Sequence, residues 1–413
     1  MSILDKHKVE YGEAPQVLVT VPGVVTLVGE FSDYGQGYAL CGTCSKTLSI
    51  AVSKRQDSFV KVLNSLSNDK KKFSLSSIKY RKEDRWGNYL KGIIIELQKL
   101  VASSVATPSA SSSTAVPKVA VSNVAVSKVA VPGMNITLAG DLLCGDGKIL
   151  SAAIGVGVCL AFSKLTGFEL KDELIAKCCY QCSSMFCNEL TNCHLVFTIL
   201  KAQEGKFMLF DMLKHSFTYV NNPFKASKYS ILLADGHIPP VAMREELYAK
   251  HNQAKAVMQE IAKISDKENL RDFPAKEIND RIIPISDVSR RIAGYVFEES
   301  QNAKAMAKYF EEKDFAQIGR ALNKVGKGLR DVMEITCPEL DWLAKRSTEV
   351  PGCIGNSIVY SGCGGFIAVV MEKASISSYI NKLDEYERIF GFEVSVEDYE
   401  PYGTATVVVD PKA

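Results

Sequence analysis

The chain has 413 residues, of which 46% are hydrophobic, so it is long for one domain and long enough for two with full cores. Its 49 Lys and Arg nearly balance its 47 Asp and Glu, and a net charge of +2 disfavours nucleic acid or an anionic membrane as a partner. The longest apolar run, Ala152 to Phe162, is about half of a membrane span. The N-terminal MSILDKHKVE lacks a signal core, so we expect a cytoplasmic protein.

Predicted strands and helices alternate along the chain, which indicates an α+β protein with a division near residues 221–228. The expected strands are Gln16–Val21, Thr26–Val28, Thr47–Val52, Phe59–Leu63, Met134–Leu138, Lys206–Met212, Ser230–Ala234, Ser357–Tyr360, Phe366–Met371 and Thr404–Val409. The expected helices are Asn88–Val101, Ser151–Leu165, Lys171–Phe186, Arg244–Ile264, Val288–Phe310, Asp314–Met333 and a segment near Ser375–Phe390.

One segment, Val101 to Pro132, consists of Ala, Val, Ser and Pro with almost no charge. The repeats KVAVS, NVAVS and KVAVP fit neither a helix nor a strand period, and its prolines interrupt regular structure. We predict an extended, poorly ordered surface insertion over residues 101–132. An added edge strand is the alternative.

The chain contains 12 cysteines, a number that would indicate a disulfide scaffold in a short secreted chain. Without a secretion signal we expect reduced thiols that pack as small hydrophobic side chains, with Cys178, Cys182 and Met185 on one helix face. A zinc site is the alternative, because Cys178 to Cys193 cluster next to His194, but the spacing does not give two clean CxxC pairs.

Three glycine-containing loops could carry chemistry. In VPGVVTLVGEFSDYGQGYAL, a strand ends at Gly29 and delivers Glu30 and Asp33, two carboxylates that could accept sugar hydroxyls. In LLCGDGKILSAA, Gly145 and Gly147 precede Ser151 and a helix, so backbone N–H groups could face phosphate. The third loop, SGCGGF, precedes a strand. Read alone, each loop is also typical of an ordinary turn.

Taken together, six collinear segments resemble the galactokinases of the GHMP small-molecule kinase superfamily. The segments are VPGVVTLVGEFSDYGQGYAL, WGNYLKG, SRRIAGYVFEESQNAKAM, GLRDVMEITCPELDWLAKRS, GNSIVYSGCGGFIAVV and YEPYGTA. They cover nearly the whole chain outside the insertion. The resemblance implies a two-domain GHMP-kinase fold, with a ribosomal S5 domain 2-like N-terminal domain over residues 1–225 and an α/β C-terminal domain over 226–413.

The resemblance also implies transfer of the γ-phosphoryl group of MgATP to the C1 hydroxyl of galactose in active relatives. Sugar and ATP would then be the small-molecule partners, and Mg²⁺ a cofactor whose site is weakened here. Glu30 and Asp33 match the sugar-binding carboxylates, and Trp86 matches an aromatic residue beside adenine. The phosphate loop corresponds to Gly145, Gly147 and Ser151, with Ser151 a weak Mg²⁺ ligand, and the third motif corresponds to Gly362, Gly364 and Gly365.

The departures from the family pattern concentrate where phosphoryl transfer needs polar groups. The motif-one Arg is Val24 and the sugar-binding His is Phe31, and two serines of the phosphate loop are Ile149 and Leu150. The expected Mg²⁺-ligand Glu aligns with Ser184. The catalytic Asp aligns with Leu195 or Val196, depending on a one-residue gap.

Two main hypotheses follow. The first is a catalytically impaired homologue that binds sugar or ATP as a sensor, or that regulates a protein partner. The second is a divergent active kinase with a changed substrate and a base recruited from Asp141, Asp146, Glu189 or Lys148, although we expect each of these four to be a solvated surface charge. A third alternative is a structural protein that binds neither ligand. His251-Asn252 replaces a Tyr-Asn pair near the sugar in the family, which leaves the identity of the sugar open.

Overall fold

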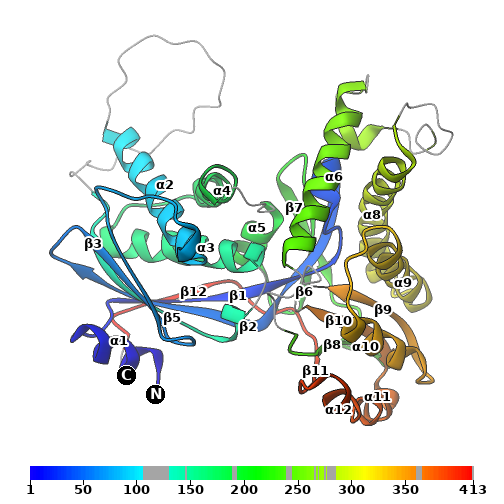
Figure 1. The fold of residues 1–413 in the computed structure, drawn as a ribbon. Coiled ribbons are helices and arrows are strands. Elements are labelled where there is room, and N and C mark those ends of the chain that lie inside the picture. Colours follow the sequence, from blue (N-terminus) through cyan, green and yellow to red (C-terminus); the bar gives the residue numbers. More distant parts are fainter. Residues whose placement is uncertain are drawn as a thin grey trace.

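The computed structural model describes residues 1–105, 130–144, 147–187, 193–238, 244–264, 267, 269–273, 276, 285–359 and 365–411. In this part of the chain, helices pack on two separate sheets, as Figure 1 shows. The predicted α+β class is therefore confirmed. Most predicted elements are present within a few residues of their expected ends.

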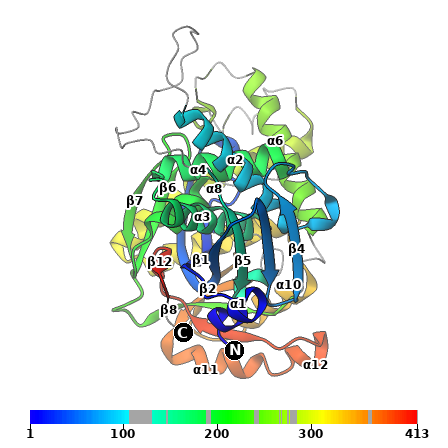
Figure 2. The same cartoon turned by 90° about the vertical axis from the view of Figure 1, so that its left-hand side faces the viewer.

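The first sheet has eight strands in the order β12-β1-β2-β5-β3-β4, with β6 paired to β2 and β7 paired to β6. Strand β1 is continuously buried from Val21 to Val28, which explains its Val-rich sequence. The last strand, β12, pairs antiparallel with β1, and both chain ends lie at the same end of the molecule (Figures 1 and 2). The strands are β1 (Val17–Val28), β2 (Tyr38–Arg55), β3 (Phe59–Asn64), β4 (Asp69–Ser74), β5 (Gly133–Ala139), β6 (Lys206–Asp211), β7 (Ser216–Asn221) and β12 (Thr406–Val409).

Helices cover both faces of this sheet, with α2, α3, α4 and α5 on one face and α1 on the other (Figures 1 and 2). The most buried is α3, which is long and apolar enough to cross a membrane, but 72% of its most apolar window is buried inside the protein. Such burial is typical of a central core helix. The helices are α1 (Ile3–Tyr11), α2 (Gly87–Val105), α3 (Gly147–Thr166), α4 (Asp172–Gln181) and α5 (Cys193–Lys201).

The second sheet is antiparallel, in the order β11-β8-β10-β9. Helix α9 packs closely on β9, where a Cβ on Gly319 would lie 2.3 Å from the carbonyl oxygen of Ile354. The strands are β8 (Tyr229–Asp235), β9 (Cys353–Val359), β10 (Phe366–Glu372) and β11 (Ser395–Asp398). The helices of this half are α6 (Arg244–Ile264), α8 (Asp287–Glu312), α9 (Phe315–Asp331), α10 (Pro338–Thr348), α11 (Ile376–Lys382) and α12 (Tyr386–Phe390).

The chain changes from the first sheet to the second between β7 and β8, close to the predicted boundary of 225/226. Strand β12 returns to the first sheet, so the C-terminal residues do not stay with the second. The two-domain division at this boundary remains a prediction.

The structure differs from the sequence-based expectations in three places. Helix α2 continues to Val105, so residues 101–105 belong to a helix and not to the insertion, whose residues 106–129 lie outside the described part. Strands β4 and β7 were not predicted, because their polar sequences DKKKFS and SFTYVN lack a clear apolar alternation. The predicted helix face that joined Cys178 and Cys182 to Met185 is wrong, because a π-helical turn over Cys182–Cys187 leaves Met185 80% exposed.

The cysteines behave as the packing interpretation predicts. Ten are described and all are free thiols, and seven of them are buried: Cys41, Cys44, Cys159, Cys178, Cys179, Cys182 and Cys187. No group of three His, Cys, Asp or Glu side chains within the described ranges is placed to hold a metal ion.

Candidate functional site

The loop that follows β1 forms the centre of the candidate site. Gly29 has a φ of +105°, and a Cβ there would lie 2.4 Å from the carbonyl oxygen of Tyr38, so only glycine fits. The chain then enters a short 3₁₀ turn over Ser32–Gly35. This turn places Glu30 and Asp33 beside α3, α5 and α6.

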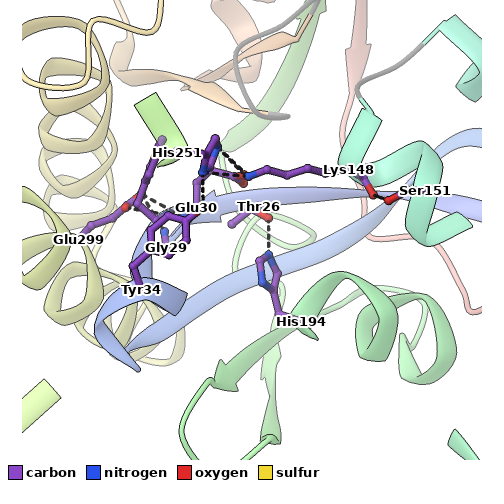
Figure 3. Close-up of polar contacts among 10 residues, drawn as sticks. Thr26, Gly29, Glu30, Tyr34, Lys148, Ser151, His194, His251 and Glu299 are labelled. Carbon is purple, nitrogen blue, oxygen red and sulfur yellow. Dashed lines mark hydrogen bonds and ion pairs between the residues drawn. The ribbon is translucent and has the colours of Figure 1, made fainter. Parts of the chain in front are cut away.

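One buried carboxylate, that of Glu299 on α8, holds the backbone of this loop. Its Oε1 accepts from the N–H groups of Gly29 and Glu30, and its Oε2 accepts from that of Phe31, each at 3.1 Å (Figure 3). Burial raises the pKa of Glu299 to about 7, although the three N–H donors oppose the shift. The loop is therefore fixed from the side of α8 by a contact across some 270 residues of sequence.

A buried ion pair lies on the opposite side of the loop. Lys148, in the first turn of α3, is 1% exposed, and its Nζ donates to Glu30 Oε1 at 3.0 Å (Figure 3). The same Nζ lies 2.7 Å from Nε2 of His251 on α6. Three elements far apart in sequence thus meet around one ammonium group.

The protonation of His251 follows from these contacts. An ammonium group only donates, so Nε2 must accept, and the neutral ring then carries its proton on Nδ1, 2.8 Å from the Tyr34 hydroxyl. Burial, followed by the charge of Lys148, lowers the pKa of His251 well below its usual value. Phe31 stacks on the ring with centroids 4.2 Å apart. The His251 ring is therefore held from its edge and its face.

Asp33 is the second carboxylate of the loop, and its environment differs from that of Glu30. Its Oδ1 atom is buried and has no hydrogen-bond partner among the described residues. Burial raises the pKa of Asp33 to about 7, with Lys148 acting against the shift and Glu30 adding to it. A buried acceptor without a donor is uncommon in folded proteins.

A second buried polar atom without a hydrogen-bond partner among the described residues is the Nδ1 of His194 on α5. His194 is fully buried, with Nε2 3.1 Å from the Thr26 hydroxyl (Figure 3), while Nδ1 has no partner among the described residues. Burial lowers its pKa to about 4, so the ring is neutral at neutral pH. His194 immediately precedes Leu195, one of the two positions that the sequence predicts in place of the family's catalytic Asp.

The structure brings only some of the predicted site residues together. Glu30, Asp33 and the first turns of α3, with Gly147 and Ser151, lie around the loop, and the Ser151 hydroxyl donates to the Lys148 carbonyl at 2.9 Å. Trp86 precedes α2 and donates through Nε1 to Asp69 on β4 at 3.2 Å. Predicted residues Gly145, Gly362 and Gly364 lie outside the described residues, as do Asp146 and Glu189.

The positions that depart from the family pattern are mostly apolar and buried. Val24 and Phe31 are 0% exposed, Leu195 and Val196 are buried, and the Ser184 hydroxyl donates to the Tyr180 carbonyl at 2.7 Å.

Two of the proposed replacement bases can be judged. Asp141 accepts from the Thr47 N–H at 2.7 Å in an exposed turn, as expected of a surface charge. The expectation that Lys148 is a solvated surface charge is wrong, because Glu30 and His251 draw it inward.

Sequence reasoning did not place Glu299 or His194 in the site, and it named Lys148 only as an alternative base that was expected to be a solvated surface charge. Glu299 and His194 stand in helical patterns that are equally typical of core helices. Lys148 follows Gly147 in the phosphate-loop pattern, but nothing in the pattern shows that its side chain turns inward.

Known proteins that are similar to this chain in sequence or fold include galactokinases and a mevalonate kinase. A family model described as the galactokinase galactose-binding signature matches residues 5–54, which include Glu30 and Asp33. Human galactokinase is 24% identical over 91% of this chain and 89% of its own, and galactokinase of a Roseiflexus species is 22% identical over 92% and 89%. The solved structure of Lactococcus lactis galactokinase complexed with galactose has a TM-score of 0.80 at 17% identity, covering 98% of both chains. Mevalonate kinase of Methanococcus jannaschii has a TM-score of 0.55 at 15% identity, covering 93% of this chain and 96% of its own.

The fold is therefore that of the GHMP kinases. In sequence the chain is similar to galactokinases over most of its length, in agreement with the resemblance of its six motifs.

Proposed function

We propose that this protein binds a galactose-like sugar and ATP but transfers the phosphoryl group poorly or not at all, so that it acts as a sensor or regulator through binding. Its galactokinase-like sequence and its GHMP-kinase fold imply sugar and MgATP as the ligands of this class in general. The proposal concerns what the altered residues of this chain do with them.

The observation that carries sugar binding is the unpaired Oδ1 of Asp33. A sugar hydroxyl would donate to this atom and remove the cost of a buried acceptor without a partner. Asp33 lies within the matched galactose-binding signature, and so does Glu30, which is already oriented by Lys148. The loop that carries both carboxylates is held in place by Glu299, so a sugar would bind without ordering it first.

The loss of efficient transfer is supported by the residues on the α3 and α5 side. General-base catalysis contributes roughly 10²- to 10⁴-fold, and one well-placed Arg contributes about 10³- to 10⁵-fold to phosphoryl transfer. Val24 can supply no such positive charge, and Ser184, Leu195 and Val196 can supply no carboxylate. The Mg²⁺ that accompanies ATP would have only the Ser151 hydroxyl among the predicted protein ligands.

A divergent active kinase is the second candidate, and two observations favour it. Asp33, with a pKa near 7, is suited to accept a proton at neutral pH. Lys148 places a positive charge in the site although Val24 cannot. This kinase would use Asp33 as its general base.

Asp33→Asn separates binding from stability. At neutral pH the raised pKa of Asp33 means that its charge is disfavoured in the folded protein, so Asn should leave the melting temperature unchanged or raise it. Galactose should raise the melting temperature of the wild type but not of Asp33→Asn. Glu312→Gln, at the exposed end of α8, is the matched control and should respond like the wild type.

The same proteins decide between the candidate functions. Magnesium-dependent formation of sugar 1-phosphate by the wild type, lost in Asp33→Asn, would establish the active kinase and overturn the binding proposal. If neither galactose nor ATP changes the melting temperature, the protein is a structural or interaction protein.

A further inference from the structure

A groove between α8 and α9 lies outside the site described above. The two helices run side by side in Figure 1. The groove has a volume of about 580 Å³ and is lined by side chains of α8 between Arg290 and Asn302 and by side chains of α9 and its C-cap between Lys324 and Val332. This volume suits a small organic molecule.

Two glycines shape this groove in different ways. A Cβ on Gly294 of α8 would meet nothing within 4 Å, so the groove is open above that residue. Gly328 of α9 instead packs under the ring of Tyr295, where an added Cβ would lie 2.1 Å from Cε2. The Tyr295 ring, together with Val325 and Val332, therefore gives the groove an apolar lining.

The groove is lined by four basic side chains, Arg290, Arg291, Lys324 and Lys327, and by three acidic ones, Glu298, Glu299 and Asp331. Arg291 donates to the carbonyl oxygen of Asp331 at 2.7 Å, and Lys327 has no ion pair with any residue that the structure describes. Lys324 pairs with Glu298 at 3.2 Å, but both side chains are more than half exposed, so water weakens the pair. These cations leave room for an anionic group of a ligand.

A buried polar atom also faces this region. Tyr295 is 7% exposed and lines the groove, and its hydroxyl has no hydrogen bond of good geometry to the described residues. Buried tyrosine hydroxyls normally have a partner. Burial, together with the nearby Glu299 carboxylate, raises the pKa of Tyr295, but this carboxylate forms no well-aligned hydrogen bond with the hydroxyl, which can therefore donate to a ligand that accepts a hydrogen bond.

The floor of the groove contacts the loop of the candidate site. Glu299 lines the groove and also accepts the N–H groups of Gly29, Glu30 and Phe31. The Tyr295 ring lies edge-on to Phe31, with centroids 6.2 Å apart. A molecule that binds Tyr295 or displaces Glu299 would change how firmly residues 29–31 are held.

We propose that the α8/α9 groove binds a small molecule with a phosphate group on a flat apolar body, and that its occupancy is transmitted through Tyr295 and Glu299 to residues 29–31. The phosphate contacts Arg291, Lys327 and the Tyr295 hydroxyl, and the body packs on the apolar lining. The groove site stands whether or not the protein transfers phosphoryl groups.

Isothermal titration with phenyl phosphate tests the site in the full chain. Gly294→Leu fills the groove from a helical position with open space, so the fold should be kept and the dissociation constant should rise about tenfold or more. Lys327→Glu should weaken binding similarly. Lys308→Ala changes an exposed lysine of α8 that lies outside the groove, and this variant should bind phenyl phosphate like the wild type.

Inorganic phosphate serves as the second probe and should bind more weakly than phenyl phosphate, because it lacks the apolar body. The proposal is overturned if phenyl phosphate does not bind the wild type, or if Gly294→Leu and Lys327→Glu bind it as tightly as the wild type does. Equal affinity for the two probes contradicts the apolar part of the site.

Hydrogen exchange tests the transmission without any sugar present. Saturating phenyl phosphate should change the exchange rate of the Gly29, Glu30 and Phe31 amides by about threefold or more, and leave β8 unchanged. Unchanged exchange at these amides under saturating ligand overturns the coupling, whatever the outcome for sugar or ATP.

Discussion

The loop of residues 29–33 is contacted by different kinds of residue on its two sides. On the α8 side, a single carboxylate accepts from three backbone N–H groups, and the loop conformation requires glycine at position 29. On the α3 and α5 side, the positions predicted to assist phosphoryl transfer hold the buried residues Val24, Leu195 and Val196, and Lys148 and His194 have their own contacts with Glu30 and Thr26. Under the proposed function, the residues that hold the sugar-binding loop differ from those that assist the reaction, so binding and transfer can be lost separately.

The largest expected effect comes from removing the Glu299 carboxylate, which holds the backbone of the loop. Glu299→Ala leaves three buried N–H groups without partners, and it should lower the free energy of unfolding by roughly 3–5 kcal/mol, since each orphaned donor costs about 1–3 kcal/mol. Urea unfolding measures it. The neighbouring Glu298→Ala removes only an exposed ion pair and should change stability by less than about 1 kcal/mol. Equal losses in the two variants would show that Glu299 does not hold the loop.

The next effect concerns the ion pair on the other side. Lys148→Met should cost about 3–5 kcal/mol, because it leaves the Glu30 carboxylate buried without its cation. Adding Glu30→Gln to Lys148→Met should restore part of this loss. A double-mutant cycle in which the two losses simply add would mean that the pair is not coupled.

A smaller effect appears with pH at His194. Its folded pKa of about 4 lies below the usual value of 6.5, so the neutral ring contributes stability that is present above pH 6.5 and lost as pH falls toward 4. Between pH 7 and pH 5, the wild type should therefore lose about 2 kcal/mol more than His194→Gln, at 1.36 kcal/mol per pKa unit.

His237→Gln is the control for this pH effect, since that side chain is 46% exposed. Its pH profile should follow that of the wild type. If His194→Gln follows the wild type as well, the imidazole is not buried in its neutral form.

The smallest effect tests the predicted adenine side. Trp86→Ala should weaken ATP binding by about threefold to tenfold if the indole stacks on a base, as aromatic stacking contributes roughly 0.5–1.5 kcal/mol. Asp69→Asn removes the anionic acceptor of the Trp86 N–H but keeps the ring, and should bind ATP like the wild type. Unchanged ATP affinity in Trp86→Ala would contradict a place for this residue beside adenine.

Much of this architecture could be predicted from the sequence, because strands such as Phe59–Leu63 and helices such as Arg244–Ile264 follow their apolar periods. The loop with Glu30 and Asp33 was also predictable from its motif. The inward turn of Lys148 was not, since a lysine after a glycine is usually solvated, and only folding brings Glu30 and His251 to it. The role of Glu299 could not be predicted for a related reason, because its hydrogen-bond partners are backbone groups that no sequence pattern indicates.

The central claim is that the site binds but does not transfer, and phosphorus NMR under single-turnover conditions tests it most directly. Wild-type protein in excess over galactose, with MgATP at saturation, is followed for the appearance of a sugar 1-phosphate resonance. The account predicts that the γ-phosphate signal persists and that no such resonance grows above the protein-free control. Stoichiometric conversion to sugar 1-phosphate within minutes would contradict it.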